Sequence, residues 1–424
     1  MEITIEKLVY GGDGLAHHHG STVFVPFVLP SERISAAAVE QKRKFVRARV
    51  ERVLSPAPER AAAPCPHFGV CGGCHYQHMP YEAELKYKTE ILRETLRRLG
   101  QIDWQGEIAV HPSPPWGYRN RAQWKIRSAG EAGGISVAIG YFRANSTALC
   151  PVQECGILSP LLQKTLLAFR TALTQRAMPP ELREIEAVSG ANDTKLMLTA
   201  VFARFPSGRQ KLAEIFRQTA PEIESLLFHD PNSERMELDG PGFVDCEAGD
   251  TTFRVGHLSF FQANRFLAGE LELHVAASAE RGRLALDLFA GVGLFTVPLA
   301  KRFHRVIAVE SNPAATRDLE SNVTGKGPIE IRNLEVERFL EKCRETPDLV
   351  VLDPPRAGLT PESIQHLGRL MPKSLTYVSC EPPTLARDLA ALTKEGYEIS
   401  AVNLFDLFPQ TFRIESVVRL TRNT

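Results

Sequence analysis

The sequence has no run of apolar residues long enough to cross a membrane. Its most apolar stretch, Leu284 to Ala300, is too short for a bilayer span and is interrupted by Asp287. The first four residues, Met1 to Thr4, have neither the basic start nor the apolar core of a secretion signal. We therefore expect a cytoplasmic protein with no membrane partner.

An excess of charge of either sign is also missing. Fifty Lys and Arg balance fifty Asp and Glu among 424 residues, so overall charge does not indicate a polyanionic partner. Hydrophobic residues make up 43% of the chain, which excludes a disordered protein. A chain of this length is expected to form two or three domains. We expect it to act as a monomer.

Basic residues nevertheless gather near the start. Between residues 31 and 54 they exceed acidic residues by four. Residues 1–55 contain short strand-like segments separated by turns, which predicts a small β-barrel. In one segment Val46 and Ala48 alternate with Arg47 and Arg49, so the arginines share a solvent face. Small barrels with a basic face commonly bind nucleic acid, although a solvated edge strand fits this segment equally well.

A linker rich in Ala and Pro leads to a central region, residues 62–250, for which mixed strands and helices are expected. Residues 81–99 and 158–176 have the periodicity of helices, the first with Leu92, Leu96 and Leu99 on one side. Along residues 119–127, four cations alternate with apolar side chains. Such a row suits a phosphate backbone, and a solvent-facing strand would show the same pattern.

Three cysteines, Cys65, Cys71 and Cys74, lie within ten residues of one another. In a reducing compartment, clustered thiols bind metal more often than they form disulfides. A fourth ligand is needed, and Cys150 is the leading candidate because it ends a strand-like segment, with Cys155 as its competitor. The spacing alone fits either zinc or an iron–sulfur cluster.

The C-terminal region, residues 251–424, carries the most specific pattern. A buried strand ends at Asp287, a glycine turn with Gly291 and Gly293 follows, and a helix begins at Thr296. The next strand ends at Glu310, whose carboxylate could bind ribose hydroxyls. This is a nucleoside-binding βαβ unit. Because a dinucleotide fold would have a small glycine in place of Thr296, the pattern favours S-adenosylmethionine as the ligand.

Two further strands deliver reactive side chains to the same edge of a parallel sheet. The strand at residues 349–353 ends with Asp353, and the strand at 375–379 runs into Cys380. Ligands of open α/β sheets bind at the carboxyl ends of the strands, so Cys380 is a nucleophile candidate beside the cofactor. The fold class predicted for this region is α/β with a Rossmann-like sheet.

Taken together, these motifs resemble the RumA/TrmA family of S-adenosylmethionine-dependent RNA (uracil-5-)-methyltransferases, over nearly the whole chain. The matching segments are Phe261-Gln262-Ala263-Asn264, Asp287 to Gly293, Asp353 to Gly358, Ser379-Cys380 and Phe408 to Glu415. The resemblance implies that the barrel is a TRAM domain, an OB-like RNA-binding module. It also implies a [4Fe-4S] cluster in the central α+β domain and 23S rRNA as substrate. In archaea, members with a barrel and a cluster act on tRNA, which is the alternative substrate.

The resemblance also assigns roles to single residues. The implied cluster ligands are Cys65, Cys71, Cys74 and Cys150. The implied cofactor contacts are Gln262, Phe289, Glu310, Asn333 and Asp353. By the same resemblance, the Cys380 thiolate attacks carbon 6 of uracil, carbon 5 accepts the methyl group, and Glu415 removes the carbon 5 proton. Such chemistry requires a uridine flipped out of its stack.

The sequence departs from the family beside the nucleophile, where Glu381 replaces the usual Asn. A carboxylate there is expected to raise the pKa of the Cys380 thiol. Gln410, Phe412 and Arg413 occupy a segment where the family has histidines. Two other functions remain open from the sequence: a non-catalytic RNA-binding protein, and a methyltransferase that acts on nitrogen or on protein.

Overall fold

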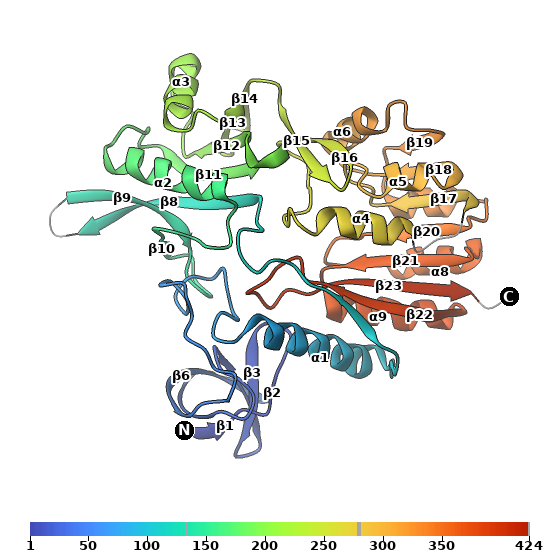
Figure 1. Ribbon diagram of the computed structural model, residues 1–424, viewed down its shortest axis with the longest axis horizontal. Helices are drawn as coiled ribbons and strands as arrows, with labels where there is room; N and C mark the ends of the chain where they lie inside the picture. Colours follow the sequence, from blue (N-terminus) through green and yellow to red (C-terminus); the bar gives the residue numbers. More distant parts are fainter. Residues whose placement is uncertain (132–133, 278–280, 423–424) are drawn as a thin grey trace.

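The computed structural model describes residues 1–131, 134–277 and 281–422 (Figure 1). Its first unit is a six-stranded sheet in the order β1-β5-β6-β4-β3-β2. The strands are β1 (Glu2–Thr4), β2 (Lys7–Leu8), β3 (Asp13–His18), β4 (Ser21–Pro26), β5 (Arg33–Gln41) and β6 (Phe45–Ser55). The alternation expected in β6 is confirmed, because Val46 and Ala48 are buried in the core of this sheet while Arg47 and Arg49 are exposed.

The second unit is a seven-stranded sheet in the order β10-β9-β8-β11-β12-β13-β14. Its elements are β8 (Arg121–Glu131), β9 (Gly134–Phe142), β10 (Leu149–Pro151), α2 (Pro160–Thr174), β11 (Leu182–Ser189), the short 3-10 helix η1 (Ala191–Asp193), β12 (Leu196–Phe202), α3 (Arg209–Thr219), β13 (Ile223–Asp230) and β14 (Arg235–Asp239). The helix expected at 158–176 is therefore confirmed. Leu162, Leu166 and Phe169 of α2 pack into one core with Trp124 of β8.

The cations of β8 do not form a free row. The Arg121 guanidinium lies 2.6 Å from Glu186 Oε1, and Lys125 forms an ion pair with Glu184. Both glutamates stand on β11, which is hydrogen-bonded to β8. The phosphate-binding face expected from this strand is therefore partly neutralised by its neighbour.

The third unit is an eight-stranded sheet in the order β19-β18-β17-β20-β21-β23-β22-β7. Its strands are β7 (Ile108–His111), β17 (Gly282–Leu288), β18 (Phe303–Val309), β19 (Ile329–Arg332), β20 (Leu349–Leu352), β21 (Ser374–Ser379), β22 (Tyr397–Phe405) and β23 (Glu415–Arg422). The five strands from β19 to β21 are parallel, and β23 is antiparallel to both of its neighbours. This confirms the predicted α/β class.

Helices cover both faces of this sheet. They are α1 (Tyr81–Gly100), α4 (Ala268–Ala277), α5 (Thr296–Ala300), α6 (Pro313–Val323), α7 (Val336–Lys342), α8 (Pro361–Leu370) and α9 (Pro382–Lys394). Helices α1, α7, α8 and α9 contribute to one apolar core, while α4, α5 and α6 contribute to the other. Among the helices of the described residues, none has both the length and the apolar character that crossing a membrane requires.

The units differ from the predicted division of the chain at two points. Helix α1 and strand β7 lie within the expected central region, yet both belong to the eight-stranded sheet and its core. The expected boundary at residue 250 falls inside the hairpin of β15 (Phe243–Ala248) and β16 (Thr251–Gly256), whose strands are paired along their length. The first difference arises because β7 pairs with β22 and α1 packs in the core of the third unit, far away in the sequence. The second arises because β15 and β16 are hydrogen-bonded to each other and cannot belong to different units.

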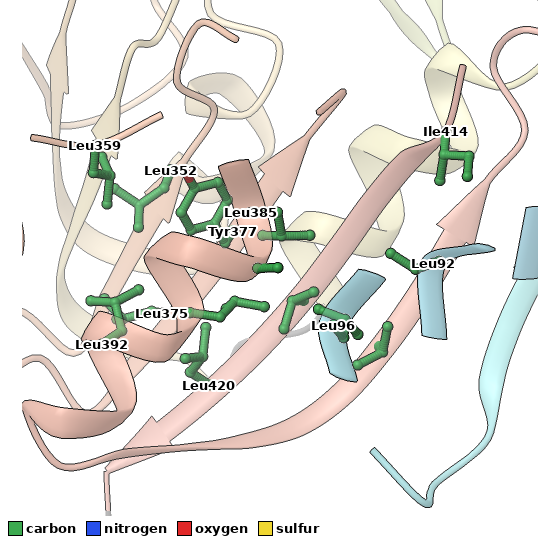
Figure 2. Close-up of a cluster of buried hydrophobic side chains, with 14 of the residues drawn as sticks. Leu92, Leu96, Leu352, Leu359, Leu375, Tyr377, Leu385, Leu392, Ile414 and Leu420 are labelled. Atoms are coloured by element: carbon green, nitrogen blue, oxygen red, sulfur yellow. The ribbon is translucent and has the colours of Figure 1, made fainter. Parts of the chain in front are cut away.

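The buried face of α1 also differs from the one expected. Leu92 and Leu96 are fully buried in the same apolar core as Leu385 and Leu392 of α9 and Leu420 of β23 (Figure 2). Leu99, expected on the same side, is 58% exposed. The helix turns Lys88 inward instead, and its side chain is fully buried.

We predict that Leu92→Ala lowers the free energy of unfolding by about 2–5 kcal/mol, because it removes buried methyl groups and leaves a cavity. Leu99→Ala is the matched control on the same helix and should change stability by only about 0.5 kcal/mol, since its side chain is exposed. Urea denaturation followed by circular dichroism measures both. Equal losses in the two variants would contradict the buried face described here.

Candidate active site and cysteine cluster

Four neighbouring strands bring the predicted site residues to one edge of the sheet. In the order β18-β17-β20-β21, the strands end just before Glu310, Phe289, Asp353 and Cys380, respectively. Because these strands are parallel, their carboxyl ends meet at the same edge. The structure therefore gathers these four residues as the sequence predicted.

The glycine turn after β17 is bound to the acid at the end of β18. The backbone N–H of Gly291 donates to Glu310 Oε2 at 2.8 Å, and the N–H of Asn312 donates to Oε1 at 2.7 Å. Asn333 Nδ2 donates to the Glu310 carbonyl at 2.9 Å and so holds the loop from the other side. Phe289 adopts a left-handed backbone with φ of 65°, a conformation rare for a non-glycine residue. The turn and the acid thus form one ordered unit.

Two carboxyl groups lie under this edge, Asp287 buried and Asp353 half-buried. Burial raises the pKa of Asp287 to about 7, and it raises the pKa of Asp353 to about 7 with a further contribution from Asp287. Thr296 donates a hydrogen bond to Asp287 Oδ2. A cation placed beside these carboxyls would favour their charged forms. The edge is therefore suited to a positively charged ligand.

The segment that carries Gln262 is tied to two other parts of the chain. Asn120 Nδ2 donates to the Gln262 carbonyl at 3.2 Å. Asn264 Nδ2 donates to Ser113 Oγ at 2.9 Å and to the Leu407 carbonyl at 3.1 Å. Asn264 is fully buried, so its part of the motif holds the fold around the site.

Cys380 and Glu415 are neighbours on adjacent strands. Ser379 of β21 pairs with Ser416 of the antiparallel strand β23. Cys380 comes directly after Ser379 and Glu415 directly before Ser416, so the two residues lie next to each other across the strands. Burial, followed by the charge of Glu415, raises the pKa of the Cys380 thiol to about 11, while Arg356 lowers it. Burial, followed by Asp353, raises the pKa of Glu415 well above its ordinary value. At neutral pH the Cys380 thiol of the free enzyme therefore favours its protonated form, and Glu415 is harder to ionise than an exposed carboxyl.

The expected effect of Glu381 has the predicted sign. Its charge raises the pKa of the Cys380 thiol, although burial and Glu415 contribute more. Arg356, from the Asp353 to Gly358 motif, is the cation that opposes them. Its effect on the thiol was not predicted from the sequence.

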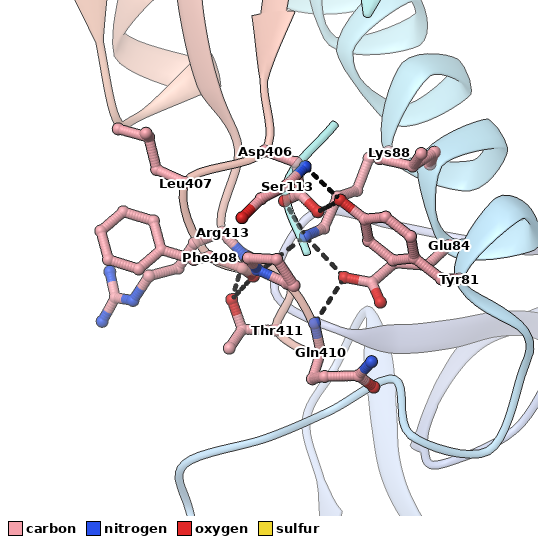
Figure 3. Close-up of polar contacts among 12 residues, drawn as sticks. Tyr81, Glu84, Lys88, Ser113, Asp406, Leu407, Phe408, Gln410, Thr411 and Arg413 are labelled. Carbon is pink, nitrogen blue, oxygen red and sulfur yellow. Dashed lines mark hydrogen bonds and ion pairs between the residues drawn. The ribbon is translucent and has the colours of Figure 1, made fainter. Parts of the chain in front are cut away.

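A buried ion-pair network holds the loop between β22 and Glu415 (Figure 3). Lys88 Nζ lies 2.6 Å from Asp406 Oδ1 and 2.7 Å from Glu84 Oε1, and all three side chains are buried. The Gln410 N–H donates to Glu84 Oε1 at 2.8 Å, and the Tyr81 hydroxyl donates to Asp406 Oδ2 at 2.8 Å. Helix α1 is thereby joined to the loop that leads to Glu415.

Electrostatics within the network favour a charged lysine. Burial opposes the charge of Lys88, but Asp406 and Glu84 raise its pKa. Burial raises the pKa of Glu84 to about 8. The sequence gives one signal of this arrangement, because Glu84 and Lys88 are one helical turn apart, a spacing that is also common on solvent-exposed helices.

Five thiols lie near one another beside β9 and β10. Cys65, Cys71, Cys74 and Cys155 line a cavity of about 100 Å³ together with Tyr141. Cys150 does not line this cavity, and its side chain contacts Cys71 instead. Burial raises the pKa of Cys71 and of Cys74 to about 12. In the described ranges, no three or more His, Cys, Asp or Glu side chains are placed to hold a metal ion.

Comparison with known proteins agrees with the motifs. A family model described as tRNA (Uracil-5-)-methyltransferase matches residues 243–423. An "uncharacterized RNA methyltransferase" of Aquifex aeolicus is 34% identical over 99% of this chain and 98% of its own length. The 23S rRNA (uracil(1939)-C(5))-methyltransferase RlmD of Alkalilimnicola ehrlichii is 33% identical over 100% of this chain and 96% of its own. The chain belongs to the RNA (uracil-5-)-methyltransferase family.

It is therefore an enzyme of that class with RNA as its substrate, as the motifs predicted. The alternatives of a non-catalytic RNA-binding protein and of a methyltransferase for nitrogen or protein are not supported. A solved structure agrees in fold: the Pyrococcus abyssi tRNA (uracil-54, C5)-methyltransferase in complex with S-adenosyl-L-homocysteine. It superposes with a TM-score of 0.78 and 26% identity, covering 99% of this chain and 100% of that one.

We predict that Lys88→Met lowers the free energy of unfolding by about 3–5 kcal/mol, because it leaves Glu84 and Asp406 buried without their cation. Lys86→Met is the matched control, since Lys86 is exposed on the same helix and its pairing distance to Glu90 is 3.9 Å. Thermal and urea denaturation measure the difference. A loss in Lys88→Met no larger than in Lys86→Met would show that the network does not stabilise the fold.

Proposed function

We propose that this RNA methyltransferase transfers a methyl group from S-adenosylmethionine to carbon 5 of a uridine in 23S rRNA, through a covalent bond to Cys380. The observation that carries the proposal is the pair of Cys380 and Glu415 on adjacent strands, at the edge where Glu310 and Asp353 end their own strands. The relatives named as 23S rRNA enzymes support the substrate, because they are 33% identical over the whole chain.

The cofactor is proposed to lie over the carboxyl ends of β17, β18 and β20. Glu310 would face ribose hydroxyls, and Phe289, Asn333 and Gln262 would line the same edge. The half-buried Asp353 suits the positive charge of the methyl donor, because a cation favours the ionised form of a carboxyl whose pKa is about 7. S-adenosylmethionine supplies an electrophilic methyl group on sulfur.

The two side chains then divide the proton chemistry. Cys380 would lose its proton to solvent, and its thiolate would bond to carbon 6 of uracil, which moves the electron pair of the carbon 5–carbon 6 double bond into an enolate. Carbon 5 would take the methyl group as the sulfur–methyl bond of the donor breaks and S-adenosylhomocysteine leaves. The Glu415 carboxylate would then remove the carbon 5 proton, so that the bond between the Cys380 sulfur and carbon 6 breaks, the double bond re-forms and the thiolate is released. The raised pKa of Glu415 makes its carboxylate a stronger base for that step.

The six-stranded sheet of residues 2–55 is proposed to be the RNA-binding module, of the TRAM type. Arg49 and Arg52 are exposed on β6, which supports a surface for phosphates. The uridine must leave its stack to meet Cys380, so single-stranded or loop RNA is the proposed target. We propose that a monomer suffices, since one chain supplies both the thiol and the carboxylate.

tRNA is the second candidate substrate. The observation that favours it is the TM-score of 0.78 with a tRNA (uracil-54, C5)-methyltransferase. The two substrates share one reaction, so an assay on separated RNAs distinguishes them.

We predict that purified enzyme forms 5-methyluridine in undermethylated 23S rRNA when methyl-labelled S-adenosylmethionine is supplied. Cys380→Ala should abolish the label, because no thiolate activates the ring. Glu415→Gln should instead accumulate a covalent RNA–protein adduct that withstands denaturing electrophoresis, because the carbon 5 proton is not removed. Cys343→Ala, at another half-buried thiol, is the control and should retain activity. Label in tRNA alone would replace 23S rRNA as substrate, and label with Cys380→Ala would refute the covalent mechanism.

We further propose that Cys65, Cys71, Cys74 and Cys150 hold a [4Fe-4S] cluster. Cys150 contacts Cys71, and Cys155 lines the cavity with Cys65, Cys71 and Cys74, so Cys155 is the alternative fourth ligand. A single zinc ion needs its ligands about 2.3 Å away on all sides. Thiols spread over the walls of a 100 Å³ cavity fit a cluster of several irons and sulfides better.

We predict that Cys150→Ser yields colourless protein lacking iron and acid-labile sulfide, whereas Cys155→Ser retains both after anaerobic purification. The two thiols are five residues apart in the same segment, so the pair is matched. Iron and sulfide analysis and visible absorbance measure the result. Loss of the cluster in Cys155→Ser with retention in Cys150→Ser would make Cys155 the fourth ligand in place of Cys150.

A further inference from the structure

A tyrosine of the N-terminal unit reaches the active site. Tyr10 lies between β2 and β3, and its hydroxyl donates to the Cys380 carbonyl at 3.4 Å. Its ring meets that of Phe412 edge-on, with the ring centroids 5.6 Å apart. Phe412 belongs to the loop that leads to Glu415. Tyr10 therefore contacts both chain segments that carry the proposed catalytic groups.

The same hydroxyl also meets Glu381. Burial raises the pKa of Tyr10, and the charge of Glu381 and a hydrogen bond to its carboxylate raise it further. Glu381 begins helix α9 without a capping hydrogen bond from its own side chain. Within the loop, the Glu381 N–H donates to Ser379 Oγ at 3.2 Å. Ser379 thus holds the loop from inside, while Tyr10 holds it from a different domain.

We propose that Tyr10 is a positioning residue for the nucleophile, whose single hydroxyl proton is shared between the Cys380 carbonyl and the Glu381 carboxylate and so holds that carboxylate beside the tyrosine. The proposal rests on the role of Cys380 given above. It makes the N-terminal sheet a part of the active site as well as an RNA-binding surface, and it explains how this chain accommodates an acid directly after its nucleophile.

The charges around the thiol determine how the pKa of Cys380 should change when the Tyr10 hydroxyl is removed. Glu415, Asp353 and Glu381 disfavour the thiolate, and Arg356 favours it. A hydroxyl that donates to Glu381 offsets part of the negative charge of that carboxylate. Without the hydroxyl, Glu381 is free to turn toward the thiol, and the thiolate of Cys380 becomes rarer at any given pH.

The test compares Tyr10→Phe with Tyr87→Phe in the full-length enzyme. Tyr87 is the matched control, because its hydroxyl also donates to a glutamate, Glu59, in the segment that follows the N-terminal sheet. Iodoacetamide labelling of Cys380, followed by mass spectrometry across a pH series, reports the thiolate without requiring turnover. Steady-state methylation of 23S rRNA gives kcat and KM separately.

Tyr10→Phe should slow Cys380 labelling and lower kcat by roughly tenfold with KM for RNA little changed, since a hydrogen bond to a charged group is lost. Tyr87→Phe should match the wild type. In a Glu381→Gln background, Tyr10→Phe should no longer slow labelling, because the two side chains act through one contact.

Three results would overturn the proposal: unchanged labelling and kcat, an equal effect of Tyr87→Phe, or a rise in KM alone, which would make Tyr10 an RNA contact. Activity in Cys380→Ala would instead overturn the proposed function. The labelling series would still report whether Tyr10 controls the thiol.

Discussion

The buried charge of Lys88 is the constraint on which the rest of the active site depends. An ammonium group with no access to water requires two carboxylates at close range, and Glu84 and Asp406 provide them from segments more than three hundred residues apart. Satisfying that charge fixes the loop from Asp406 to Glu415. Glu415, the proposed base, therefore ends a loop held by helix α1, which carries none of the proposed catalytic groups.

The site beside it concentrates negative charge under a single edge. Asp287 and Glu415 are buried and Asp353 is half-buried, and each carries a pKa above its ordinary value. Such a site is costly to ionise when empty and becomes easier to ionise when a cation enters. A methyl donor bound at this edge, as proposed, would therefore favour the ionised forms of these carboxyls.

The sequence predicts well the features that depend on local pattern. The strand, glycine turn and acid from Asp287 to Glu310, and the strands before Asp353 and Cys380, were all placed correctly because periodicity and turn residues act within a few positions. The choice between Cys150 and Cys155 could not be made that way, since it depends on which thiol faces a cavity built by other segments. Lys88 and Tyr10 were missed for the same reason. Their partners are set by tertiary contacts with segments more than three hundred residues away, which no local pattern around Lys88 or Tyr10 indicates.

The position of β7 at the edge of the eight-stranded sheet has a consequence for biosynthesis. This strand pairs with β22, and the apolar face of α1 packs on α9, so both elements emerge from the ribosome almost three hundred residues before their partners. Until residues 382–405 are made, the nascent chain carries an uncovered leucine stripe and an unpaired strand edge. Contacts of such long range fold slowly and leave intermediates open to aggregation. Helix α1 and strand β7 therefore reach their final packing only after residues 382–405 have been synthesised.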